Sequence, residues 1–141
     1  MRSTDGRRWT NNVTGGSGLS DIAYGNGYFV AVGGGRRMRS ADGITWQNEV
    51  TGGSARSIVF TGEEFFAAGG REAYTSVDGR EWTAHALAVA VDLVAYADGI
   101  YVGAAWSPQA TTLLRSTDGR QWERIASGGN SLTDLVGVSR Q

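Results

Sequence analysis

One seven-residue motif occurs four times along the chain and limits its fold more than any other feature. The motif has the pattern Ser-x-Asp-Gly-x-x-Trp, and successive aspartates lie 37, 36 and 40 residues apart. Four matches at nearly constant spacing indicate an internal repeat in which each copy forms the same structural unit. The residues of the motif are Ser3, Asp5, Gly6, Trp9, Ser40, Asp42, Gly43, Trp46, Ser76, Asp78, Gly79, Trp82, Ser116, Asp118, Gly119 and Trp122.

The segments between the motifs alternate short apolar runs with turn residues. Asn26-Gly27 and Asp98-Gly99 separate such runs, and both dipeptides favour the type I′ turn that joins antiparallel strands. Helical periodicity appears nowhere, so each complete repeat is predicted to contain four short strands. In the first complete repeat we expect these strands around Ile22, around Val30, at 36–40 and at 45–50.

A repeat of about 35–50 residues with four short strands has the size of a blade in a β-propeller. The alternatives are a β-sandwich, which would not normally repeat so regularly, and a β-solenoid, whose coils are generally shorter. We therefore predict an all-β fold: a single, partial β-propeller domain over 1–141, built from four-stranded antiparallel blades. The repeats are expected at approximately 1–18, 19–54, 55–89, 90–130 and 131–141.

These boundaries correspond to about 3.5 blades per chain, with half a blade before the three complete repeats and one strand after them. Open sheet edges invite pairing, so we expect the two parts to close the ring as one composite blade. Closure within one chain would give four blades, and closure between two chains would give about eight. Because thin blades rich in Gly and Ala suit wider rings, we expect a homodimer. A monomeric four-bladed ring and a piece of a larger propeller are the alternatives.

The repeated motif resembles the Asp-box, or BNR repeat, whose usual form is Ser-x-Asp-x-Gly-x-x-Trp. This chain lacks the residue between Asp and Gly, which makes the turn one residue shorter. Asp-boxes occur in sialidase-like propellers, glycoside hydrolases and sorting receptors, and this chain looks most similar to uncharacterised bacterial propellers. The resemblance implies a structural role: Ser and Asp bind the turn backbone, Gly supplies a positive φ, and Trp covers a neighbouring blade.

The resemblance does not extend to a sialidase active site. Sialidase-like enzymes hold the substrate carboxylate with an arginine cluster near the propeller centre, whereas the predicted inner strands offer only Arg56. The box aspartates are expected on the outer rim, too far apart to act together on one bond. His85 is the only histidine and there is no cysteine, which leaves a metal site or a Ser-His-Asp triad without support. We expect no catalytic residues, no cofactor and no metal.

Two features remain as candidate ligand contacts. Asp21, Arg56, Asp92 and Asp134 fall at the starts of innermost strands, which should meet at one mouth of the central channel. Trp106 is the only tryptophan outside a motif and lies in an insertion between the second and third strands of its repeat. Insertions in repeat proteins often form the binding face. The plainer explanations are a polar lining of a wet channel and ordinary packing of the indole.

We therefore expect a non-catalytic, self-assembling scaffold that binds a carbohydrate or a protein. The alternatives are a fragment of a sialidase-like glycoside hydrolase, and a designed or recently duplicated repeat protein that assembles without a ligand. The net charge of −1 argues against a nucleic-acid partner. No apolar run approaches the roughly 20 residues that cross a membrane. The N-terminal residues contain no apolar signal segment, so a cytoplasmic location is the default expectation.

Overall fold

The computed structural model describes residues 1–10, 18–128 and 134–137. In this part of the chain twelve strands form three four-stranded antiparallel sheets, and no helix occurs. Blade 1 contains β1 (Leu19–Gly25), β2 (Tyr28–Gly33), β3 (Arg36–Ser40) and β4 (Gln47–Thr51). Blade 2 contains β5 (Ser57–Phe60), β6 (Phe65–Gly69), β7 (Glu72–Ser76) and β8 (Thr83–Ala86). Blade 3 contains β9 (Leu93–Ala97), β10 (Ile100–Trp106), β11 (Thr111–Ser116) and β12 (Glu123–Ser127).

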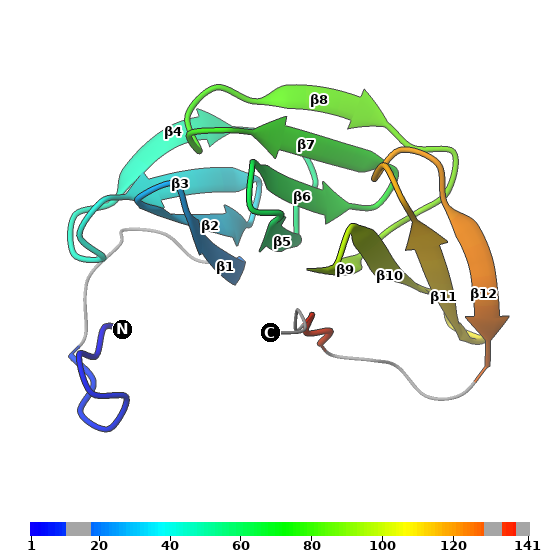
Figure 1. Ribbon diagram of the computed structural model, residues 1–141, viewed down its shortest axis with the longest axis horizontal. Helices are drawn as coiled ribbons and strands as arrows, with labels where there is room; N and C mark the ends of the chain where they lie inside the picture. The colour runs from blue at the N-terminus through cyan, green and yellow to red at the C-terminus, as the bar shows by residue number, and fades with distance from the viewer. Residues whose placement is uncertain (11–17, 129–133, 138–141) are drawn as a thin grey trace.

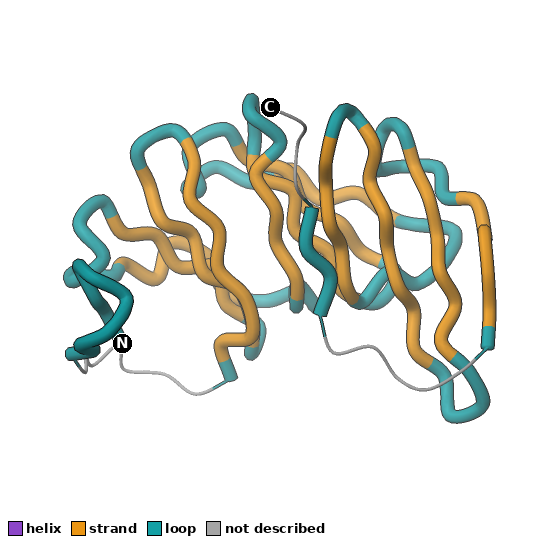
Figure 2. The backbone as a smooth tube through the Cα atoms, turned by 60° about the horizontal axis from the view of Figure 1, so that its bottom comes forward, coloured by secondary structure: helices purple, strands orange, loops and turns teal. Residues whose placement is uncertain are grey.

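Each blade is a meander in which consecutive strands are hydrogen-bonded neighbours, which confirms the predicted four-stranded antiparallel unit. The blades lie along an arc, with β1, β5 and β9 on its inner side and β4, β8 and β12 on its outer side (Figure 1). Figure 2 shows the blades as separate sheets joined by loops. The arrangement brings the first residues of the three innermost strands toward a common axis.

The predicted type I′ turns join the first two strands of blade 1 and of blade 3. Asn26 and Asp98 are the non-glycine residues with positive φ in the described part of the chain, at 48° and 50°. The glycine after each of them has a φ of 83° or 79°, so both central positions are left-handed as this turn requires. The turns set the register of β1 with β2 and of β9 with β10.

The fourth strand of blade 1 begins later than the sequence predicts. We expected it at 45–50, whereas β4 begins at Gln47. Thr45 belongs to the preceding turn, because its N–H donates to the Asp42 carboxylate at 2.8 Å. The hydrogen bonds to the Asp42 carboxylate extend the turn, so the strand begins two residues later than the hydrophobic pattern indicates.

The parts of the chain on either side of the three blades are only partly described. Arg2 and Thr10 form an isolated antiparallel bridge around the first motif, in the same register as Arg39 with Gln47. Of the final predicted repeat, 131–141, the structure describes residues 134–137, which form no strand and lie against β9. The rest of the expected strand in that repeat lies outside the described residues.

The hydrophobic core lies between adjacent blades. One cluster joins Val30 and Val32 of blade 1 to Ile58 and Phe65 of blade 2. The other joins blade 2 to blade 3 and contains Phe66, Ala68, Val94, Tyr101 and Leu114. A blade is a single sheet without a second layer of its own, so each blade depends on its neighbour to bury its apolar face.

The four motifs close the turn before the outermost strand in the same way. The serine Oγ accepts a hydrogen bond from the glycine N–H at 2.7–2.9 Å. One aspartate oxygen accepts the N–H groups of the two residues after the glycine at 2.8–3.0 Å. The four glycines have φ between 70° and 74°, where a side chain would be strained. These side chains replace the backbone hydrogen bonds that a tight turn leaves unmade.

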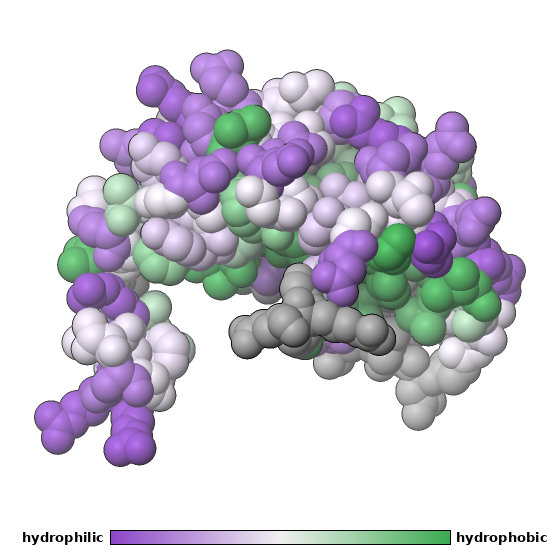
Figure 3. Space-filling view, in the orientation of Figure 1, coloured by the Kyte–Doolittle hydropathy of each residue, from purple (hydrophilic) through white to green (hydrophobic). Residues whose placement is uncertain are grey.

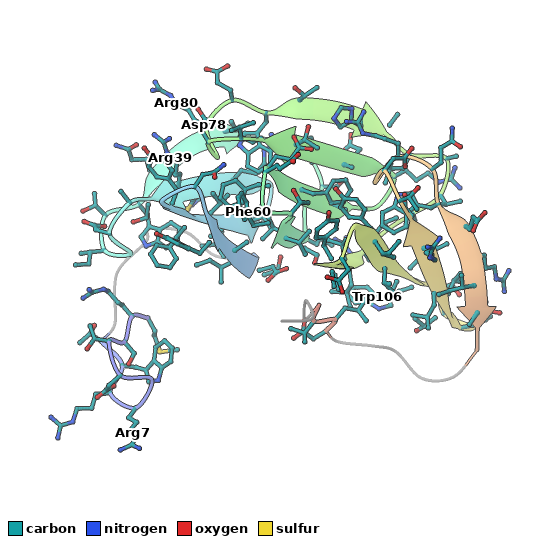
Figure 4. The ribbon with its side chains drawn as sticks, in the orientation of Figure 1. Arg7, Arg39, Phe60, Asp78, Arg80 and Trp106 are labelled. Atoms are coloured by element: carbon teal, nitrogen blue, oxygen red, sulfur yellow. The ribbon has the colours of Figure 1, made fainter. Side chains whose placement is uncertain are left out.

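The motif tryptophans cover the preceding blade where one is present. Trp82 packs on the cluster between blades 1 and 2, and Trp122 packs on the cluster between blades 2 and 3. Trp46, in blade 1, is half-buried, whereas Trp9 is 59% exposed. Arg39 of blade 1 points toward the motif of blade 2 and donates to the Asp78 carbonyl at 3.2 Å (Figure 4). The turn is therefore also an interblade contact.

The packing between blades predicts which substitutions destabilise the protein most. Phe66 is 1% exposed and packs on Tyr101 of blade 3 with a ring separation of 4.9 Å. We expect Phe66→Ala to lower the free energy of unfolding by about 3–5 kcal/mol, measured by urea denaturation, because it opens a cavity between two blades. Val77→Ala is the control: Val77 is 63% exposed, and the change should stay within about 0.5 kcal/mol. Equal losses would contradict an interblade core.

The motif carboxylates predict how stability depends on pH. The N–H groups of Thr45 and Ile44, together with the Ser40 hydroxyl, lower the pKa of Asp42 from 3.8 to about 2. A carboxyl with a depressed folded-state pKa contributes stability that is complete above about pH 4 and is lost as the pH falls toward 2. We expect Asp42→Asn to reduce the fall of the melting temperature over this interval. Glu63→Gln, which removes an exposed carboxylate outside the motifs, should leave the fall unchanged.

Candidate ligand-binding site

The inner ends of the blades enclose a cavity of about 420 Å³, which we call the axial pocket. It contains all five residues that the sequence analysis proposed as ligand contacts, although they come from three blades and the C-terminal segment. Figure 4 shows Trp106 on the open side of the arc, next to that segment. The pocket is lined by Ser20, Asp21, Arg56, Asp92, Leu93, Trp106 and Asp134.

The charged residues of the pocket come from two adjacent positions of the repeat. The strand registers make Ser20, Arg56 and Asp92 equivalent positions of the three repeats. Asp21 occupies the next position of the repeat. The sequence analysis placed Asp21, Arg56, Asp92 and Asp134 at strand starts, whereas Arg56 and Asp92 directly precede β5 and β9, and Asp134 belongs to no strand. Aligning the repeats by register would have identified Ser20 as a lining residue.

Asp92 is bound to the backbone of two blades. The residue is 7% exposed, and its Oδ1 accepts the Gly70 N–H of blade 2 at 3.3 Å. Its Oδ2 accepts the Trp106 N–H at the end of β10 at 3.1 Å. The Arg56 guanidinium lies 3.8 Å from Oδ1. Asp92 therefore positions Trp106 and neutralises part of the charge of Arg56.

Asp21 links the innermost strands of blades 1 and 2. Its Oδ2 accepts the Ile58 N–H at 2.8 Å and the Ser57 hydroxyl at 3.0 Å, while its Oδ1 accepts the Ile22 N–H at 2.8 Å. Ser57 continues the link, because its Oγ accepts the Val94 N–H of blade 3 at 3.1 Å. The sequence analysis did not single out Ser57, which carries no charge and matches no motif.

The remaining side chains of the pocket are those that a ligand would meet. The Arg56 side chain is 58% exposed, and Trp106, which also lines the pocket, is 41% exposed as a residue. Asp134 is exposed, with its Oδ1 accepting the Leu135 N–H at 2.8 Å. A guanidinium, an indole and a carboxylate thus share one cavity. This set offers hydrogen-bond donors, acceptors and an apolar surface together.

Other chemistry has less support in the described residues. His85 lies on β8 with its Nε2 3.0 Å from the Thr75 hydroxyl, and burial lowers its pKa. It is not part of the axial pocket. No group of three or more His, Asp or Glu residues in the described ranges is placed to hold a metal ion. Within the same ranges no helix is long and apolar enough to cross a membrane.

Solved structures that resemble this chain are β-propeller proteins. A structure of YCF48 bound to D1 peptide matches 75% of this chain and 38% of its own, with 18% identity and a TM-score of 0.58. A quinonprotein alcohol dehydrogenase-like protein from Bacteroides thetaiotaomicron matches 92% of this chain and 38% of its own, with 11% identity and a TM-score of 0.56. A GH32 β-fructofuranosidase from Bombyx mori in complex with sucrose matches 77% and 35%, with 13% identity and a TM-score of 0.50.

These likenesses show the fold of the chain. Together with the three four-stranded sheets, they confirm a partial β-propeller of about three blades. The chain spans less than two fifths of the length of each of these structures. No protein-family model matches the sequence, and no curated protein does.

The geometry of the pocket predicts that its aspartates differ in their effect on stability. Asp92→Ala should lower the free energy of unfolding by about 1–3 kcal/mol, because it leaves the Gly70 and Trp106 N–H groups without their acceptor. Asp134→Ala, at an exposed position, should change it by no more than about 0.5 kcal/mol. Urea denaturation of both variants measures the difference, and equal effects would contradict the assignment of Asp92 to the scaffold.

Proposed function

We propose that this chain is a non-catalytic β-propeller binding module whose axial pocket binds a carbohydrate. The observation that carries the proposal is the convergence of Trp106, Arg56 and Asp134 on one cavity. A sugar ring has an apolar C–H face that packs on an exposed indole. Its hydroxyl groups both donate and accept hydrogen bonds, and charged partners strengthen these bonds. The guanidinium and the carboxylate supply one partner of each kind.

The size and position of the pocket support a small ligand. Its volume of about 420 Å³ lies within the range of small-molecule sites, which is roughly 300–1,000 Å³. A mono- or disaccharide suits this volume. Propellers solved with sucrose and with a peptide are both similar to this chain in fold. An indole beside a carboxylate and a guanidinium suits a sugar better than a peptide, because it combines a flat apolar surface with a hydrogen-bond acceptor and a donor.

The hydrogen bonds of the aspartates support binding without turnover. Glycoside hydrolysis generally needs two carboxyl groups on either side of the bond that breaks, one of which gives up a proton. Asp21 and Asp92 accept hydrogen bonds from backbone N–H groups, so their carboxylates are engaged by the scaffold itself. Among the described residues that line the pocket, Asp134 is the exposed aspartate, and a single exposed carboxylate supports binding over acid–base catalysis.

We also infer that the repeated turns belong to the Asp-box class in a form shortened by one residue. The support is that the serine, aspartate and glycine make the same hydrogen bonds in all four copies. In this interpretation the motifs are structural, and the ligand contacts lie away from them, at the inner ends of the blades.

A glycan array followed by calorimetric titration with the best-bound sugar tests the binding function. We expect Trp106→Ala to weaken binding at least about tenfold, equivalent to ~1.4 kcal/mol, because the sugar loses its stacking surface. The matched control is Trp9→Ala, which removes an indole that is 59% exposed outside the pocket. Its affinity should equal that of the unmodified chain.

Three outcomes would contradict the proposal. One is the absence of binding to any glycan, and another is equal affinity of Trp106→Ala and the unmodified chain. The third is hydrolysis of fluorogenic glycosides that disappears in Asp92→Asn or Asp134→Asn, which would favour a hydrolase. Selection of a peptide from a displayed library, with no glycan bound, would replace the sugar by a protein ligand.

A further inference from the structure

Each blade carries the same aromatic pair across its two innermost strands. The ring centroids of Tyr24 and Phe29 are 4.7 Å apart in blade 1. The equivalent pairs are Phe60 with Phe65 in blade 2, at 5.0 Å, and Tyr96 with Tyr101 in blade 3, at 4.7 Å. In blades 2 and 3 these rings belong to the clusters shared with the preceding blade. We call the surface that carries the pair the upstream face of a blade.

The upstream face is buried in blades 2 and 3 and exposed in blade 1. The strand registers align Ile22 with Ile58 and Val94. Ile58 and Val94 are 4% and 2% exposed, whereas Ile22 is 54% exposed. Tyr24, beside it, is 58% exposed. Figure 3 shows hydrophobic residues along the inner edge of the arc next to blade 1, while hydrophilic residues dominate the outer side of blades 1 and 2. Blade 1 therefore presents a surface that the same repeat buries elsewhere in the chain.

The internal interfaces show what covers such a face. An upstream face is covered by the opposite face of the preceding blade, which we call the downstream face. The innermost strand contributes Ala23 to this face in blade 1 and Val59 in blade 2. Residues 134–137 repeat this strand beside blade 3. The Leu135 N–H binds the Asp134 carboxylate at 2.8 Å, as the Ile22 N–H binds Asp21. Val136 is therefore the counterpart of Ala23.

Val136 is 81% exposed, although its counterparts pack at interfaces. The segment that contains it lies against β9, and Ala95 of β9 and Val102 of β10 line the groove beside it. A contact between a downstream face and an upstream face occurs twice inside the chain, between blades 1 and 2 and between blades 2 and 3. Val136 of one molecule and the upstream face of blade 1 of another could form the same contact. Both halves are apolar, and both are uncovered.

We propose that two copies of this chain associate head to tail, with residues 134–137 of one copy packed on the upstream face of blade 1 of the other. The contact is heterologous, because different surfaces of the two copies meet. Two such contacts would close a ring of two copies, and an open arrangement would give longer assemblies. The proposal does not depend on the ligand of the axial pocket.

Light scattering on a size-exclusion column, over a range of protein concentrations, tests the proposal. We expect a mass of about twice 14.9 kDa or a higher multiple. Ile22→Asp should return the mass to 14.9 kDa at concentrations where the unmodified chain is associated. Val136→Asp should do the same from the other half of the contact. Far-UV circular dichroism checks that each variant is folded, and the exposure of both positions favours this.

Ile44→Asp is the matched control. Ile44 is 50% exposed on the motif turn of blade 1, and its equivalents Arg80 and Arg120 stay exposed in blades that have an upstream neighbour. This variant should keep the mass of the unmodified chain. A mass of 14.9 kDa for the unmodified chain at every concentration would overturn the proposal. Association that survives both Ile22→Asp and Val136→Asp would overturn it as well.

Discussion

The contact between adjacent blades is the interaction on which the rest of this structure depends. A four-stranded blade has no second layer, so it cannot bury its own apolar face. Phe65 and Phe66, neighbours on β6, are 0% and 1% exposed because they point into different clusters, one on each side of blade 2. Blade 2 thus takes part in both core clusters, whereas blades 1 and 3 each take part in one. Close packing between blades stabilises the fold, and a blade face without a neighbouring blade leaves its apolar side chains exposed.

Polar side chains hold the innermost strands where hydrophobic packing ends. Asp21 and Ser57 accept N–H groups of the next blade, and Asp92 accepts N–H groups from two blades. A buried N–H without a partner is costly, so these side chains are part of the scaffold even though they line a cavity. Leu93 occupies the position of Asp21 and Ser57 in blade 3 and cannot accept a hydrogen bond. The side-chain hydrogen bonds that join blade 1 to blade 2 and blade 2 to blade 3 therefore do not continue from this position of blade 3.

This division separates the residues that build the axial pocket from those that face into it. Asp92 fixes the end of β10, and so the place of Trp106, from inside the scaffold. Arg56 and Asp134 extend toward the open side with much of their surface exposed. The base of the pocket is therefore held by hydrogen bonds to the scaffold, whereas Arg56 and Asp134 are exposed. Repeat proteins commonly diversify their ligands in this manner, by changing rim residues on a constant fold.

The sequence by itself determined the repeat, the strand order and the turns, because these follow from local patterns. Gly43 at a positive φ and the Asn26-Gly27 turn are read directly from the residue types. It also placed Asp21, Arg56, Asp92 and Asp134 near one axis, since equivalent positions of a repeat meet there, whereas only the tertiary structure brought Trp106 into the same cavity. Only the tertiary structure decided that Asp92 is buried and bonded to two blades, whereas Asp134 is exposed. Burial and hydrogen bonding depend on neighbours distant in the chain, and a repeated sequence pattern does not reveal which copies have a neighbour.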